Sequence, residues 1–92
     1  MLFLARMDVQ FPAHLSTGEV ARMQGLEKEY SQTLQREGQL VSIWRVVGEY
    51  ANYSVFDVGS NDELHQILSG FPMYPFMKIK VTPLAKHPNS IR

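Results

Sequence analysis

Glu27 stands where the sequence pattern calls for an apolar side chain. Val20, Met23, Tyr30 and Leu34 recur at the spacing of one helical face, and Glu27 occupies the position that completes this stripe. A carboxylate among apolar side chains is costly to ionise, so we expect its pKa to be raised. Such a carboxylate can accept a proton near neutral pH, which is the chemistry of a general base.

A purely structural role for Glu27 is the alternative. Leu26 would then fill the core, and Glu27 would lie at its edge, paired with Lys28 or Arg45. Periodicity alone leaves both interpretations open.

Polar residues near the second and third predicted strands are candidates for binding a small ligand. Asn52 and Ser54 share a strand face with Tyr50 and Phe56. Two small polar groups among aromatic rings suit a pocket wall, although they could equally pair across the sheet. Arg45 also lies on a strand, where it is either a rim residue with a buried stem or a ligand for an anion.

Several other kinds of chemistry are excluded. The three histidines, His14, His65 and His87, lie in a loop, on a helix flank and near the C-terminus, without metal-ligand spacing. The chain has no cysteine, which excludes disulfides, thiol nucleophiles and thiolate metal sites and is typical of a reducing cytoplasm. It also lacks a Gly-rich phosphate loop and a G-x-S-x-G nucleophile elbow. We therefore expect no metal site.

The composition is that of a small globular domain. Hydrophobic residues make up 45% and charged residues 20% of the 92 residues, and the formal net charge is zero. A neutral chain lacks the basic surface that nucleic acid binding requires. No apolar run approaches the ~20 residues that span a bilayer, and the N-terminal segment lacks the pattern of a signal peptide.

The length also bears on assembly. A chain of 92 residues buries only roughly two-thirds of its unfolded surface and would be marginally stable alone. We therefore expect a homo-oligomer, with a stable monomer as the alternative.

Four segments have the pattern of strands. Strand-like alternation or a continuous apolar run occurs at residues 2–11, 40–47, 50–58 and 76–84. In the second of these, Val41, Ile43, Trp44, Val46 and Val47 predict a well-buried strand. The turn at residues 48–49 predicts that this strand forms a hairpin with the next.

Two helices are expected between the strands. Capping-box patterns at residues 16–19 and 60–63 mark where they begin. Gly38 and Gly70 are placed to end them.

The order strand–helix–strand–strand–helix–strand predicts the fold class. It is α+β, a ferredoxin-like βαββαβ sandwich with two helices on one face of a four-stranded antiparallel sheet. Residues 1–84 would form the single domain, and residues 85–92 a C-terminal tail that contacts a neighbouring subunit. Because Trp44, Phe56 and other large residues lie on the strands, we expect another subunit to cover the second face of the sheet.

Motifs along nearly the whole chain carry a resemblance to a known family. The most specific is the run Tyr50–Val58. The others are Met1-Leu2-Phe3, Met7, Val9, Pro12, Glu27-Lys28, Leu34–Gly38, Ile43-Trp44-Arg45, Glu63-Leu64-His65, Pro75-Phe76 and His87-Pro88. With these motifs the chain resembles the muconolactone isomerases, small cytoplasmic enzymes of bacterial catechol degradation.

The resemblance implies a ring-like decamer, without metal or cofactor, whose pockets lie between subunits. The substrate would be a five-membered unsaturated lactone with an acetate side chain. The family's glutamate matches Glu27, which would take the proton from the ring carbon that bears the side chain. Hydrogen-bond donors would stabilise the dienolate at the lactone carbonyl, and in the isomerases the proton returns next to that carbonyl.

Departures from the family's pattern favour one of its branches. Leu40 and Val41 stand where the isomerases have Trp-Arg, and Phe76 stands where they have tyrosine. An apolar wall of Leu40 and Val41 suits a chlorine atom, which favours the chloromuconolactone dehalogenases. There, proton abstraction by Glu27 would expel chloride from 5-chloromuconolactone and give dienelactone. The alternatives are isomerisation to 3-oxoadipate enol-lactone and a non-catalytic, small-ligand-binding ferredoxin-like oligomer.

The predicted site therefore has one catalytic residue, Glu27. The substrate carboxylate needs a cation, for which Arg45, Lys28, His87 and Arg92 are candidates. The full set of predicted substrate-binding residues is Arg45, Asn52, Ser54, Tyr50, Leu40, Lys28 and His87.

Overall fold

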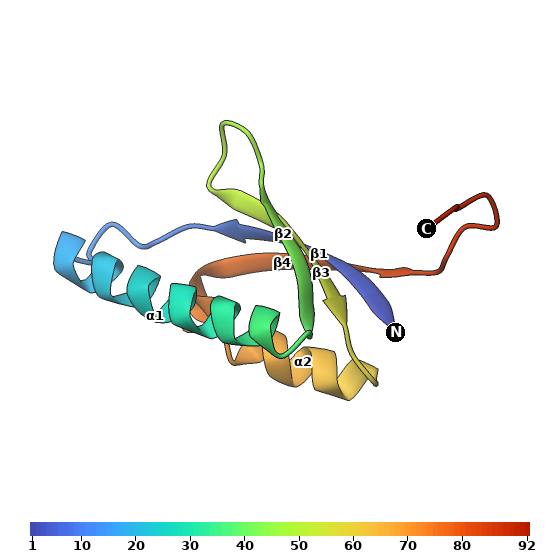
Figure 1. Ribbon diagram of the computed structural model, residues 1–92. Coiled ribbons are helices and arrows are strands. Elements are labelled where there is room, and N and C mark those ends of the chain that lie inside the picture. Colours follow the sequence, from blue (N-terminus) through green and yellow to red (C-terminus); the bar gives the residue numbers. More distant parts are fainter.

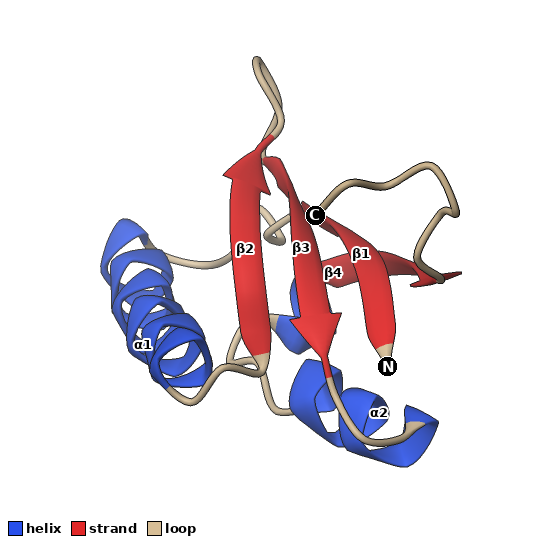
Figure 2. Ribbon diagram, turned by 45° about the vertical axis from the view of Figure 1, so that its right-hand side comes forward, coloured by secondary structure: helices blue, strands red, loops and turns tan.

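Four antiparallel strands form one sheet, and two helices lie on one of its faces (Figure 1). The computed structural model describes all residues, 1–92. Its elements are β1 (Leu2–Val9), α1 (Thr17–Arg36), β2 (Leu40–Arg45), β3 (Ala51–Asp57), α2 (Asn61–Ser69), the 3-10 turn η1 (Tyr74–Phe76) and β4 (Met77–Leu84). The strand order is β2-β3-β1-β4, with every neighbouring pair antiparallel (Figure 2). The predicted ferredoxin-like class is confirmed.

The core lies between the sheet and the helices. Alternate residues of β1 face the helices, and Phe3, Ala5 and Met7 are each buried, in agreement with the alternation of residues 2–11. Phe56 of β3 packs with them and is fully buried. The expectation that Phe56 belongs to the uncovered sheet face is therefore corrected. The strand β1 ends at Val9, the last residue that pairs with β4, rather than at Phe11.

The predicted burial of the second strand is wrong. Only Leu40 of β2 is buried, whereas the Trp44 side chain is 68% exposed and that of Val47 is 95% exposed. The reason is topological, because β2 is an edge strand with a neighbour on one side only. Val46 and Val47 lie beyond its end, in the turn where Gly48 adopts a φ of 80°.

The helix ends follow the predicted capping signals. The Ser16 hydroxyl accepts a hydrogen bond from the Glu19 N–H at 3.1 Å, and Ser60 caps α2 in the same way. In the expected capping box the Glu63 carboxylate would accept a hydrogen bond from the Ser60 N–H, but it accepts one from the Gly59 N–H instead. Gly38 follows the end of α1 with a φ of 82°.

A close junction joins the two helices. The Tyr30 hydroxyl of α1 donates to the Ile67 carbonyl of α2 at 2.7 Å, and the Tyr30 ring packs edge-on against Phe71. Gly70 allows this approach, because a Cβ at that position would overlap the Tyr30 hydroxyl. The junction therefore fixes the start of the loop that leads from α2 to β4.

Residues 85–92 form no helix or strand and extend away from the sheet (Figure 1). All of them are exposed. Neither helix of the chain has the length and apolar character needed to cross a membrane.

Candidate active site

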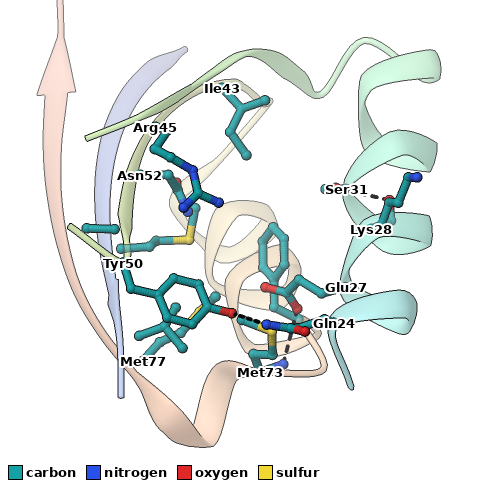
Figure 3. A pocket seen from close by; sticks show the side chains of 14 residues that line it. Gln24, Glu27, Lys28, Ser31, Ile43, Arg45, Tyr50, Asn52, Met73 and Met77 are labelled. Atoms are coloured by element: carbon teal, nitrogen blue, oxygen red, sulfur yellow. Dashed lines mark hydrogen bonds between the residues drawn. The ribbon is translucent and has the colours of Figure 1, made fainter. Parts of the chain in front are cut away.

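A cavity of about 470 Å³ lies between α1 and the sheet (Figure 3). One wall is a single face of α1, with Gln24, Glu27, Lys28 and Ser31. The opposite wall comes from the strands and the residues flanking them, and the floor from the segment after α2. These residues are Met7, Val9, Ile43, Arg45, Tyr50, Ala51, Asn52, Phe71, Met73 and Met77.

Glu27 is half-buried in this cavity, as the helical stripe predicts. The Met73 N–H donates a hydrogen bond to Glu27 Oε1 at 3.1 Å. Burial raises the pKa of the Glu27 carboxyl, and the Met73 hydrogen bond opposes this rise only in part. The second carboxylate oxygen has no hydrogen-bond partner in the chain. The group can therefore take up a proton at a free oxygen while the other oxygen fixes its orientation.

The contacts expected for a purely structural Glu27 are absent. Leu26 is 44% exposed and does not fill the core. Neither Lys28 nor Arg45 forms an ion pair with Glu27, since the ion pairs of the chain involve only Arg6 and the N-terminal amine as cations.

The cavity lining also includes two cationic side chains that form no ion pair. Arg45 extends from β2 into the cavity, whereas Lys28 lies at its outer edge on α1 (Figure 3). An unpaired guanidinium facing a cavity can bind a carboxylate in a two-pronged hydrogen bond.

Of three polar residues on or next to β3, two line the cavity and one lies behind its wall. Tyr50 lines it, and its hydroxyl accepts a hydrogen bond from Gln24 Nε2 at 2.9 Å. Asn52 lines it, with its Oδ1 accepting from the Ser54 hydroxyl at 2.8 Å. Ser54 is fully buried behind Asn52 and does not reach the cavity. The two small polar residues thus pair along the strand, not across the sheet.

Three predicted binding residues lie outside the cavity of this subunit. Ser54 is one of them. Leu40 is 2% exposed and belongs to the core, while His87 lies in the exposed tail. Val41 is also absent from the cavity lining and is 58% exposed. A register shift between Leu40 and Ser42 interrupts the alternation of β2, so the apolar residue of β2 in the cavity is Ile43.

Sequence reasoning missed several residues of the cavity. Gln24 and Ser31 lie three residues before and four after Glu27, so helical periodicity places them on its face. That signal was present in the sequence. Met73 contributes a main-chain N–H from a loop, and side-chain types carry no signal for such a donor.

The fold and the cavity define a class: small βαββαβ proteins with a partly desolvated carboxylate opposite an unpaired arginine. The family model for muconolactone delta-isomerase matches residues 1–90. The muconolactone delta-isomerase of Cupriavidus pinatubonensis is 59% identical over the full length of both chains. That of Acinetobacter baylyi is 52% identical over all of this chain and 96% of its own.

A solved structure agrees with these relatives. The crystal structure of a muconolactone isomerase superimposes with a TM-score of 0.95 at 44% identity, covering 100% of this chain and 96% of that one. The chain belongs to the muconolactone delta-isomerase family.

Proposed function

We propose that this protein is a muconolactone delta-isomerase that moves the ring double bond of muconolactone to give 3-oxoadipate enol-lactone. One observation carries the proposal: the Glu27 carboxylate lies half-buried in the cavity, unpaired with any cation and held by the Met73 N–H. The names of the relatives, which share 52–59% of their residues with this chain, point to the same reaction.

Glu27 would carry one proton between two ring carbons. Ionised Glu27 takes the proton from the carbon that bears the acetate side chain, at the carboxylate oxygen not occupied by Met73. The electron pair of the broken C–H bond spreads through the ring to the lactone carbonyl oxygen. The carboxyl group then returns the proton to the carbon next to the carbonyl. No atom is gained or lost, and Glu27 ends the cycle ionised.

Arg45 is our assignment for binding the acetate carboxylate of the substrate. It faces the cavity and has no acidic partner, so its charge is available to a ligand. Lys28 at the rim adds positive potential that favours an anionic substrate. Apolar side chains complete the walls that contact the ring: Met7, Ile43, Phe71 and Met77.

We further propose that the subunits form a homo-oligomer, with ten copies as the family resemblance implies. The support in this chain is the uncovered sheet face, where Trp44 is 68% and Tyr53 is 37% exposed and the two are cross-strand partners. Sedimentation measures the size of the assembly. A monomer at micromolar concentration would contradict this part of the proposal.

Chloride elimination, the reaction that the substitutions at residues 40 and 41 favoured, loses its structural basis. Neither Leu40 nor Val41 lines the cavity, so they form no wall for a chlorine atom in this subunit. The isomerase reaction is therefore the better-supported one.

The decisive experiment supplies purified protein with muconolactone and with 5-chloromuconolactone in parallel. We expect turnover of muconolactone, followed by its change in ultraviolet absorbance. Chloride release from the chlorinated lactone without turnover of muconolactone would overturn the isomerase assignment. Inertness toward both would favour a non-catalytic binding protein.

A further inference from the structure

Ser54 is the one polar side chain in the buried core. It lies on β3 between Ala5 of β1 and Ile43 of β2, and its exposed fraction is 0%. Burying a hydroxyl is unfavourable unless it is hydrogen-bonded. Its side-chain partner is Asn52, two residues earlier on the same strand, so the bond joins no two elements of the fold. Stabilising the tertiary structure therefore does not explain the presence of this hydroxyl.

The hydroxyl fixes the orientation of the Asn52 amide. A serine has one proton to donate, and a buried one has to reach an acceptor. Ser54 Oγ donates to Asn52 Oδ1 at 2.8 Å. If the amide were turned over, its NH2 group would face the serine, and the serine proton would lose its acceptor. The amide oxygen is thus held on the Ser54 side, and Nδ2 is left free for other partners.

The free Nδ2 belongs to a residue that lines the cavity. Asn52 lies on the sheet wall, while Glu27 lies on the helix wall facing it (Figure 3). A lactone ring bound between these walls can direct the C–H bond of the carbon bearing the side chain toward Glu27 and its carbonyl oxygen toward the amide. Arg45, the cross-strand partner of Asn52, is charged whether or not the reaction has begun. A neutral donor held in a fixed orientation, such as this amide, can stabilise the negative charge that develops on the carbonyl oxygen in the transition state.

We propose that Asn52 donates a hydrogen bond from Nδ2 to the lactone carbonyl oxygen as this oxygen becomes negative, and that Ser54 positions the amide. The inference deepens the proposed function and rests on it for the identity of the substrate. Asn52 is then a catalytic residue. Ser54 does not touch the substrate and acts only through Asn52.

The test is a double-mutant cycle with Asn52→Ala, Ser54→Ala and the combined variant, measured with muconolactone. Removing one donor to an oxyanion lowers kcat about 100-fold, which we expect for Asn52→Ala. Removing a residue that orients such a donor lowers activity by about 10-fold, which we expect for Ser54→Ala, mainly in kcat and not in KM. The combined variant should be no slower than Asn52→Ala alone, because Ser54 has nothing left to orient. Losses that multiply, or a Ser54→Ala variant with wild-type kcat, would overturn the proposal.

Ser42→Ala is the matched control. Ser42 is a partly buried serine on β2 whose strand partner is Val55, and it does not line the cavity. We expect its kcat to equal that of the wild type. Thermal melting checks folding of each variant. If Ser54→Ala does not fold, Ser54→Cys keeps the side-chain size with a far weaker donor and takes its place in the cycle.

Binding of the tetronate ion, a stable cyclic enolate, supplies a readout that needs no turnover. Calorimetry should show weaker binding for Asn52→Ala and Ser54→Ala, and no further loss in the combined variant. If the wild type does not convert muconolactone but this pattern holds, the proposed function fails and the role of the amide stands. If muconolactone is converted but the variants bind tetronate like the wild type, or the wild type does not bind it, the role of the amide fails alone.

Discussion

Two arginines of the sheet lie in opposite electrostatic surroundings. Arg6 of β1 lies on the open face, where it donates to both carboxylate oxygens of Asp8 at 3.0 Å and to Glu49 at 3.0 Å. It also donates to the Tyr53 hydroxyl at 3.3 Å, and its guanidinium lies 5.3 Å from the centre of that ring. Arg45 of β2 lies on the helix side and has no acidic partner.

This difference separates a structural charge from one available to a ligand. Hydrogen bonds to Asp8 and Tyr53 raise the pKa of the Arg6 guanidinium, and its hydrogen bond to Glu49 ties the β2–β3 turn to β1. On the cavity side, Glu27, Arg45 and Asn52 each keep hydrogen-bonding capacity that the chain does not use. Unused capacity concentrated in one cavity is what a binding site for a polar ligand requires.

The largest effect is expected for Glu27→Gln. The substitution keeps the size of the side chain but removes the proton acceptor, so kcat should fall at least ~100-fold with the fold retained. Glu49→Gln on the open face is the matched control and should leave kcat near the wild-type value. Steady-state kinetics with muconolactone measures both. Near-normal turnover by Glu27→Gln would refute its assignment as the base.

Substitution of Arg45 tests whether the arginine without an acidic partner binds the substrate. Arg45→Met removes the charge and keeps much of the apolar stem, so KM for muconolactone should rise about 10-fold to 100-fold, the worth of a charge-assisted hydrogen bond. The matched variant Arg6→Met should leave KM unchanged. A rise in KM for both variants would show that general positive charge, and not the unpaired state of Arg45, attracts the substrate.

The pH dependence should follow the desolvation of Glu27. Because burial raises its pKa, the ionised, active form is lost as the pH falls through a value above that of an ordinary glutamate. Below that pKa, kcat/KM should drop about tenfold per pH unit, as for a single essential base. A kcat/KM profile that breaks at or below the ordinary glutamate pKa would contradict this cause.

The same shift has a consequence for stability. A group whose pKa is raised on folding stabilises the native state below its unfolded pKa, and this contribution is lost as the pH rises through the folded pKa. Glu27→Gln should therefore have a higher Tm than the wild type near neutral pH, and the difference should shrink in acid. An equal Tm at both pH values would show that Glu27 is not desolvated.

The smallest effect is expected for Arg6→Met. Exposed ion pairs contribute little to stability, so we expect a slight fall in the free energy of unfolding that diminishes further in high salt. Urea unfolding at low and high ionic strength measures it. A large, salt-independent loss would show that the Arg6 contacts contribute more to stability than exposed ion pairs do.

The elements and the burial of Glu27 could be predicted because their signals are local. Apolar periodicity placed Glu27 on the core-facing stripe of its helix, and the capping serines placed the starts of both helices. The burial of β2 could not be read in the same way, since apolar residues such as Trp44 do not indicate whether a strand lies at the edge of a sheet. The wall expected from Leu40 and Val41 is absent because Leu40 is buried in the core and Val41 lies where a register shift interrupts the alternation. The Met73 N–H belongs to the main chain, which every sequence shares.

That last donor belongs to the backbone, so mutation cannot easily remove it from Glu27. Any residue except proline at position 73 supplies an N–H there, provided that the loop keeps its path. What can be lost is the path of the loop, which depends on Gly70 accepting the close approach of Tyr30. Gly70, which has no side chain and does not line the cavity, thus limits which sequences can keep the Met73 N–H on Glu27.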